Sequence, residues 1–168
     1  MPCRYVATGT TGRNVSLWDA CAYESSLGKR VVADVQLPCD GSGVQAGLVL
    51  NWHLVGVALR ENYFFAALDR GNGRLKLLFW TGSMFVSFGE AGPLTIDCDL
   101  VYRLTAKITA SGPVNTRIQL EAANASGGAV LAQLEVTTSR YLPDDGLFGL
   151  SSNLGPAEFS RFEVTEYP

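Results

Sequence analysis

Apolar and polar side chains alternate along much of this chain. Between residues 31 and 37 one apolar set falls on every second position and comprises Val31, Ala33, Val35 and Leu37. The same period of two recurs at residues 102–108, 117–123 and 130–137. Because successive side chains of a β-strand point to opposite faces of a sheet, this period predicts strands with one face in a core.

Three denser apolar and aromatic stretches lie between the alternating ones, at residues 46–52, 62–69 and 74–80. Glycine-containing turns such as Gly71–Arg74 separate them, and strands at this spacing predict a β-sandwich or barrel. We count about a dozen strands by this pattern reading and find no linker, so residues 1–168 are expected to form a single domain. Residues 1–30 are the least clear part and are either an N-terminal arm or an extra edge strand.

Net charge and hydropathy limit the classes of partner that the chain is expected to bind. The chain has 13 basic and 16 acidic residues, a net charge of −3, without the basic cluster that nucleic acid requires. No apolar run approaches the ~18 residues of a membrane span, so we expect no membrane contact, and the start lacks a secretory-signal pattern. Only 17% of residues are charged, against about 25% in an average soluble domain. We therefore expect copies of the chain or another protein to cover part of its surface.

The four cysteines are widely spaced, at Cys3, Cys21, Cys39 and Cys98. They form no CxxC pair and His53 is the sole histidine, which argues against a zinc site. Two disulfides are arithmetically allowed, but buried free thiols are the interpretation we favour.

The segments AGLVLNW (46–52), NYFFAALDRGNGRLKLLFW (62–80), YRLTAKI (102–108), IQLEA (118–122), DDGLFGLSS (144–152) and AEFSRFEV (157–164) follow one another in a familiar order. This order resembles the concanavalin A-like, laminin-G-like jelly rolls. The resemblance covers about Gln45 to Val164 and implies an all-β jelly-roll β-sandwich of two antiparallel sheets. That superfamily includes carbohydrate-binding modules, secreted glycosidases, adhesion domains and virion proteins, so the resemblance predicts the fold more firmly than the activity.

Catalytic patterns are lacking. A glycosidase needs two carboxyl groups facing each other across a groove, whereas Asp97 and Asp99 read as a solvated loop and Glu163 and Glu166 fall on opposite faces of a strand. A serine or cysteine triad would need a histidine base, for which His53 is the sole candidate. We therefore expect no enzyme activity and no cofactor.

Two binding chemistries remain. Asp69 and Asn72, in the turn after residues 62–69, offer oxygen ligands for calcium, although such residues also occur in turns for backbone reasons alone. A glycan site would use exposed aromatic rings and planar polar groups, and the candidates are Trp52, Arg60, Tyr63, Lys76 and Trp80. Alternatively, both tryptophans cover a core.

The favoured prediction is a structural protein on the surface of a phage-type virion. It would be a capsid-decorating (cement) or tail component that binds a larger protein shell and copies of itself, with residues 1–30 as the contacting arm. Deleting that arm is expected to leave a folded domain that no longer assembles. The alternative is a carbohydrate-binding, lectin-like module that is secreted or held at a cell surface.

Overall fold

The protein is an all-β jelly-roll sandwich of two antiparallel sheets, which confirms the expected fold class. The computed structural model describes residues 5–10, 13–18, 28–39, 43–111, 115–140 and 146–168. Within these ranges there is no helix that could span a membrane. The strands that they form are β1 (Tyr5–Thr10), β2 (Arg13–Trp18), β3 (Gly28–Gln36), β4 (Gln45–Val55), β5 (Arg60–Asp69), β6 (Arg74–Trp80), β7 (Phe85–Ala91), β8 (Tyr102–Ala110), β9 (Thr116–Asn124), β10 (Val130–Thr138), β11 (Leu147–Asn153) and β12 (Glu158–Tyr167).

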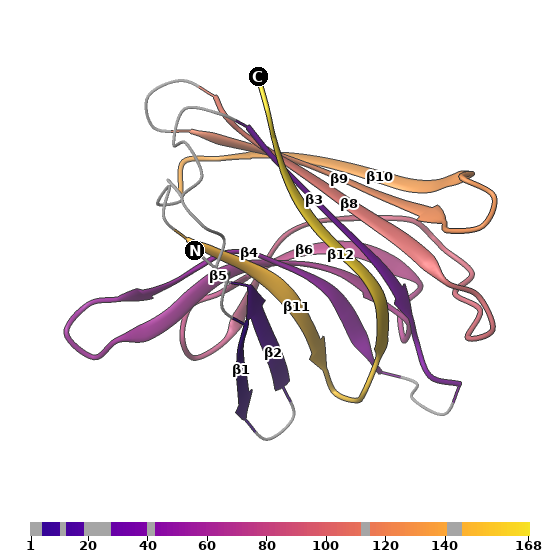
Figure 1. The fold of residues 1–168 in the computed structure, drawn as a ribbon, viewed down its shortest axis with the longest axis horizontal. Helices are drawn as coiled ribbons and strands as arrows, with labels where there is room; N and C mark the ends of the chain where they lie inside the picture. The colour runs from indigo at the N-terminus through magenta and orange to yellow at the C-terminus, as the bar shows by residue number, and fades with distance from the viewer. Residues whose placement is uncertain (1–4, 11–12, 19–27, 40–42, 112–114, 141–145) are drawn as a thin grey trace.

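The two sheets lie face to face, with the five-stranded sheet above the seven-stranded one in the view of Figure 1. The seven-stranded sheet has the order β1-β2-β11-β4-β5-β6-β7, and the five-stranded sheet has the order β10-β9-β8-β3-β12. Consecutive strands change sheets at five points, namely β2–β3, β3–β4, β7–β8, β10–β11 and β11–β12. These crossings join the two layers covalently.

The main core fills the space between the sheets. It contains the apolar faces predicted at residues 31–37, 102–108 and 117–123, represented by Val31, Leu104 and Ile118. The opposing sheet contributes Phe64 and Leu77, both with no exposed surface. The period-two reading of these strands is therefore confirmed.

A second, smaller apolar cluster lies on the other face of the seven-stranded sheet. Val49, Phe65 and Leu78 belong to it, while Phe64, the neighbour of Phe65, belongs to the main core. The strands β4, β5 and β6 are thus buried on both faces. This is why their sequences are almost continuously apolar.

The N-terminal region is built into the sandwich. Strand β1 is an edge strand, and β2 pairs with β11 in the seven-stranded sheet. Val15 and Leu17 of β2 are at most 2% exposed and belong to the outer cluster. This agrees with the edge-strand alternative for residues 1–30. We now expect their deletion to destabilise the domain, because it would uncover this cluster and also remove the first residues of β3.

Strand β4 contains a β-bulge before its last residues. The register with β5 shifts between Leu50 and His53, and Asn51 has a left-handed backbone with φ of 50°. A Cβ atom on Gly146 would lie 2.8 Å from the Cα of Asn51. A glycine is required at that position because the bulge brings the two backbones together.

Candidate functional site

An aromatic cluster occupies one end of the outer face of the seven-stranded sheet. Tyr63 of β5 pairs directly with Trp80 of β6, which pairs in turn with Phe85 of β7. The ring of Phe85 lies 4.9 Å from that of Trp80 and 6.3 Å from that of Tyr63, measured between centroids. Trp52 of β4 packs against the same cluster. We refer to Trp52, Tyr63, Trp80 and Phe85 as the aromatic cluster.

Arg13 brings a positive charge onto the aromatic cluster from β2. Its guanidinium carbon lies 4.2 Å from the centroid of the Trp80 ring, a cation–π geometry. One guanidinium nitrogen donates a hydrogen bond of 2.9 Å to the Tyr63 hydroxyl, and another forms an ion pair with Glu61. The side chains of Arg13 and Glu61 are 11% and 23% exposed, so this ion pair is half-sheltered from water.

The environment of Tyr63 keeps its hydroxyl protonated. Burial raises the pKa of Tyr63 to about 12, and the nearby Arg13 charge offsets only part of this rise. The hydroxyl therefore accepts the hydrogen bond from Arg13 at any physiological pH and still carries its own proton. The polar groups around Trp80 are thus held in fixed positions.

The structure brings together only part of the glycan-binding set predicted from the sequence. Trp52 and Trp80 are both half-buried and belong to one cluster, as the aromatic prediction requires. Tyr63, however, has no exposed surface. It cannot touch a ligand in this conformation and instead supports Arg13, which corrects its assignment as part of an exposed platform.

The two predicted cations lie elsewhere. Arg60 is exposed at the start of β5, beside the β6–β7 turn, where a Cβ on Gly82 would lie 2.8 Å from its own Cβ. Lys76 shares the outer face with Trp80 but is engaged at the opposite end of β6, where its ammonium group lies 2.6 Å from Asp69. Sequence reasoning missed Arg13 and Glu61, the charged pair that does reach the aromatic cluster.

Asp69 is the centre of a polar network and is only 2% exposed. Besides the ammonium of Lys76, its carboxylate accepts hydrogen bonds from the Gln45 amide at 2.9 Å and from the side-chain and backbone nitrogens of Asn72 at 3.0 and 3.1 Å. Burial would raise its pKa, but the hydrogen bonds from Lys76, Asn72 and Gln45 outweigh that effect and lower it. A calcium ion at Asp69 and Asn72 would have to displace Lys76, so calcium binding there stays an untested prediction.

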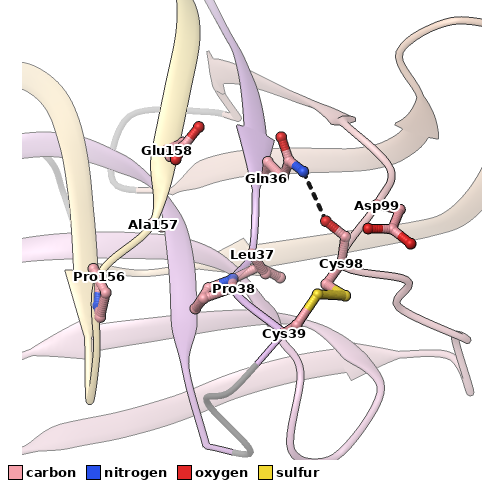
Figure 2. Close-up of a pocket in the computed structure, with 9 residues that line it drawn as sticks. All are labelled: Gln36, Leu37, Pro38, Cys39, Cys98, Asp99, Pro156, Ala157 and Glu158. Carbon is pink, nitrogen blue, oxygen red and sulfur yellow. Dashed lines mark hydrogen bonds between the residues drawn. A yellow bond between two sulfur atoms is a disulfide. The ribbon is translucent and has the colours of Figure 1, made fainter.

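A cavity of about 230 Å³ opens at the rim of the sandwich, between the end of β3 and the start of β12. Figure 2 shows the Cys39–Cys98 disulfide on one side of it and Pro156 and Ala157 on the other. Gln36 donates a hydrogen bond of 2.7 Å to the Cys98 carbonyl. The disulfide corrects the free-thiol interpretation for these two cysteines, while Cys3 and Cys21 lie outside the described residues.

A polar hollow of about 340 Å³ lies on the outer face of the five-stranded sheet. Its polar lining comes from β8, β9 and β10 and consists of Thr105, Lys107, Gln119, Glu121, Gln133 and Glu135. Gln119 donates a hydrogen bond of 2.8 Å to Glu135, and Gln133 donates one of 3.1 Å to Glu121. These groups satisfy one another across the strands, and none of the residues that line the hollow is aromatic.

Comparison with known proteins shows similarity at the level of the fold. No protein-family model matches the sequence, and no curated protein matches it. Among solved structures, a carbohydrate binding module, CBM66 from Bacillus subtilis, has a TM-score of 0.65 and 17% sequence identity, covering 97% of this chain and 91% of its own.

Two further structures share the architecture. A bifunctional GH43-CE protein of Bacteroides eggerthii gives a TM-score of 0.57 at 12% identity and covers 90% of this chain, which spans only 20% of that protein. A PL-14 alginate lyase from Aplysia kurodai gives 0.56 at 12% identity, with 92% of this chain and 76% of the lyase covered. At these identities the likeness establishes the jelly-roll fold and no more. Nothing in the comparisons supports the virion interpretation, which stays a prediction.

Proposed function

We propose that this protein is a non-enzymatic carbohydrate-binding module that works outside the cell or at its surface. The observation that carries the proposal is the half-buried Trp80 ring with the Arg13 guanidinium stacked on it and Glu61 paired to Arg13. The fold that the chain shares with the Bacillus carbohydrate binding module supports the same class.

The chemistry of the aromatic cluster suits a sugar ring. An aromatic face offers apolar contact to the C–H groups of a sugar, and the planar guanidinium and carboxylate groups respectively donate to and accept from its hydroxyl groups. Hydrogen bonds to charged groups contribute about 1.5–3 kcal/mol each. Because Arg13 and Glu61 already hold each other in place, less conformational entropy is lost when they bind a ligand.

The disulfide supports an extracellular location for the protein. Bonded cysteine pairs such as Cys39–Cys98 persist mainly in secreted and surface proteins, because cytosolic thiols are kept reduced. This favours the extracellular alternative of the sequence analysis.

The absence of catalysis is part of the proposal and rests on how the candidate groups are used. His53 places its Nδ1 atom 2.9 Å from the carbonyl of Asn51, within its own strand. Asp97 accepts a hydrogen bond of 2.9 Å from the backbone nitrogen of Asp99, the geometry of an Asx turn. Glu163 is bonded to Arg161. Each group is accounted for by a local structural role.

A screen of the intact protein against a broad set of glycans, with and without calcium, tests the proposal. We expect binding to one class of sugar that weakens at least about tenfold in Trp80→Phe and in Glu61→Gln. The first substitution removes part of the stacking surface, and the second removes the negative charge that strengthens the acceptor and holds Arg13. Gln133→Ala in the polar hollow is the matched control and should bind as the unmodified protein does.

Two results would contradict the assignment. Binding that survives both substitutions but is lost in Gln133→Ala would move the site to the five-stranded sheet. Failure to bind any glycan in either condition would refute the carbohydrate-binding function and return attention to a protein ligand. Circular dichroism of each variant separates loss of binding from loss of the fold.

A further inference from the structure

The hairpin formed by the ends of β4 and β5 projects beyond the rest of its sheet. The last residue of β4 that pairs with β11 is Trp52, opposite Leu147, and the first residue of β5 that pairs with β6 is Tyr63, opposite Trp80. Strands β4 and β5 continue to pair with each other beyond this point, as far as Val55 and Arg60. Figure 1 shows this hairpin extending away from the sandwich at the left of the view. Among the residues that the structure describes, no further strand pairs with its tip.

The projecting tip is apolar without interruption from Leu54 to Leu59, with the sequence LVGVAL. All of these residues are exposed, and the exposed fractions are 47% for Leu54, 45% for Val55, 106% for Val57 and 64% for Leu59. Leu59 has φ of 47°, a conformation that glycine or asparagine adopts at lower cost. Turn geometry does not explain a leucine at that position, nor does packing, because its side chain is largely in solvent.

The apolar side chains surround the tip instead of lining one side of it. Leu54 and Val55 are adjacent in a strand and therefore point to opposite faces of the hairpin. Val57 and Leu59 extend the apolar surface around the turn itself. A surface that docks against a protein usually has its apolar side chains on one face. A tip that is apolar on every side is instead suited to insertion into a lipid layer, which surrounds it.

Charged groups lie at the base of the tip and not within it. Glu61 is neutralised by its ion pair with Arg13. Arg60 is exposed and forms no ion pair with any described residue. An apolar tip with a cation at its base matches the boundary between lipid chains and headgroups, where an arginine keeps its charge in the polar layer.

A second apolar loop accompanies the hairpin at this end of the sheet. The β6–β7 turn lies against the base of the hairpin at Arg60, as the close approach of Gly82 shows. Met84 and Val86, in and just after this turn, are 61% and 39% exposed. Two neighbouring loops thus present apolar side chains from one edge of the sandwich.

From these observations we infer that the β4–β5 tip inserts into the interfacial layer of a lipid surface. The absence of a spanning segment predicted no membrane contact, but shallow insertion of a loop needs no such segment. The part of the surface expected to be covered in the working state is, on this inference, the hairpin tip. Contact between the tip and lipid would not require carbohydrate binding.

Co-sedimentation of the intact protein with phosphatidylcholine vesicles, which carry no sugar, tests the inference. We expect the protein to sediment with the vesicles. We expect Val57→Asp and Leu59→Asp each to weaken partitioning by roughly tenfold or more, because each places a charge where the inference puts an apolar side chain in the lipid layer. Val57→Leu should retain binding. Val130→Asp is the matched control, since Val130 is 50% exposed in the other sheet.

Each other outcome overturns the inference. If the protein does not sediment with the vesicles, lipid is not what the tip binds. An equal loss in Val130→Asp would show that the effect follows net charge and not the tip. If the protein is an oligomer that Val57→Asp dissociates, and no vesicle binding is found, a second copy covers the tip. Sugar binding is measured separately, so failure of one proposal leaves the other standing.

Discussion

Removing the Cys39–Cys98 disulfide should destabilise the protein mainly through the unfolded state. The bridge joins residues 59 positions apart. For a closed loop of that length, the chain-entropy relation gives a loss of about 4 kcal/mol at 25 °C when the cross-link is removed. Little packing is lost in the folded state, because Cys39 is exposed and Cys98 only half-buried.

The double variant Cys39→Ala/Cys98→Ala measures this effect without exposing other cysteines to a reductant. In urea unfolding followed by tryptophan fluorescence, a loss of about 4 kcal/mol corresponds to a midpoint lower by roughly 2 M for an m-value near 2 kcal/mol per M. The m-value should also rise, because an uncrosslinked unfolded chain exposes more surface.

Two results would contradict an effect on the unfolded state. A loss below about 1 kcal/mol would mean that the chain already keeps these ends close when unfolded, since the loop-closure cost is then not recovered. A large loss with an unchanged m-value would place the effect in the folded sandwich instead. Hydrogen exchange of the backbone amide of Gln36, whose side-chain amide donates to the Cys98 carbonyl, would then show whether the rim has loosened.

Two further predictions concern the sheets. Gly47→Ala should destabilise the protein by about 3 kcal/mol or more in thermal unfolding, because the new Cβ would meet the carbonyl oxygen of Ala66 at 2.0 Å; Gly127→Ala, with open space around it, is the control. The pKa of Asp34 is held below its ordinary value of 3.8, chiefly by the hydrogen bond from Arg103. The stability that this pair contributes is complete above pH 3.8 and is lost as the pH falls through the folded-state pKa, so unfolding of Asp34→Asn should depend less steeply on pH in that acidic range, and an unchanged slope would contradict it.

The parts of the fold that follow from local periodicity were predictable. Strands β3 and β8 alternate because only one of their faces enters the core, and their buried residues could be read from the sequence directly. Strand β5 is buried on both faces, so Phe64 and Phe65 are equally apolar. The period of two could not say which face carries the second cluster.

The candidate site was less predictable because it is assembled from distant strands. Arg13 reaches Tyr63 and Glu61 only because β2 pairs with β11, which pairs with β4. No local signal encodes that path. Glu61 could have been found, since it lies two residues from Tyr63 and therefore on the same face of β5. The partner of Cys39 was equally hidden, because spacing alone does not fix a pairing.

The bulge in β4 also marks the place where the hairpin ladder changes register. Asn51 interrupts the ladder between Leu50 and His53 in β4, whereas β5 continues without a break and pairs with β6 as far as Tyr63 and Trp80. Changes in length or sequence between Leu54 and Leu59 need not shift the register of the core strands. The segment from Leu54 to Leu59 can therefore be replaced by another loop, and the sandwich is a scaffold on which foreign loops could be displayed.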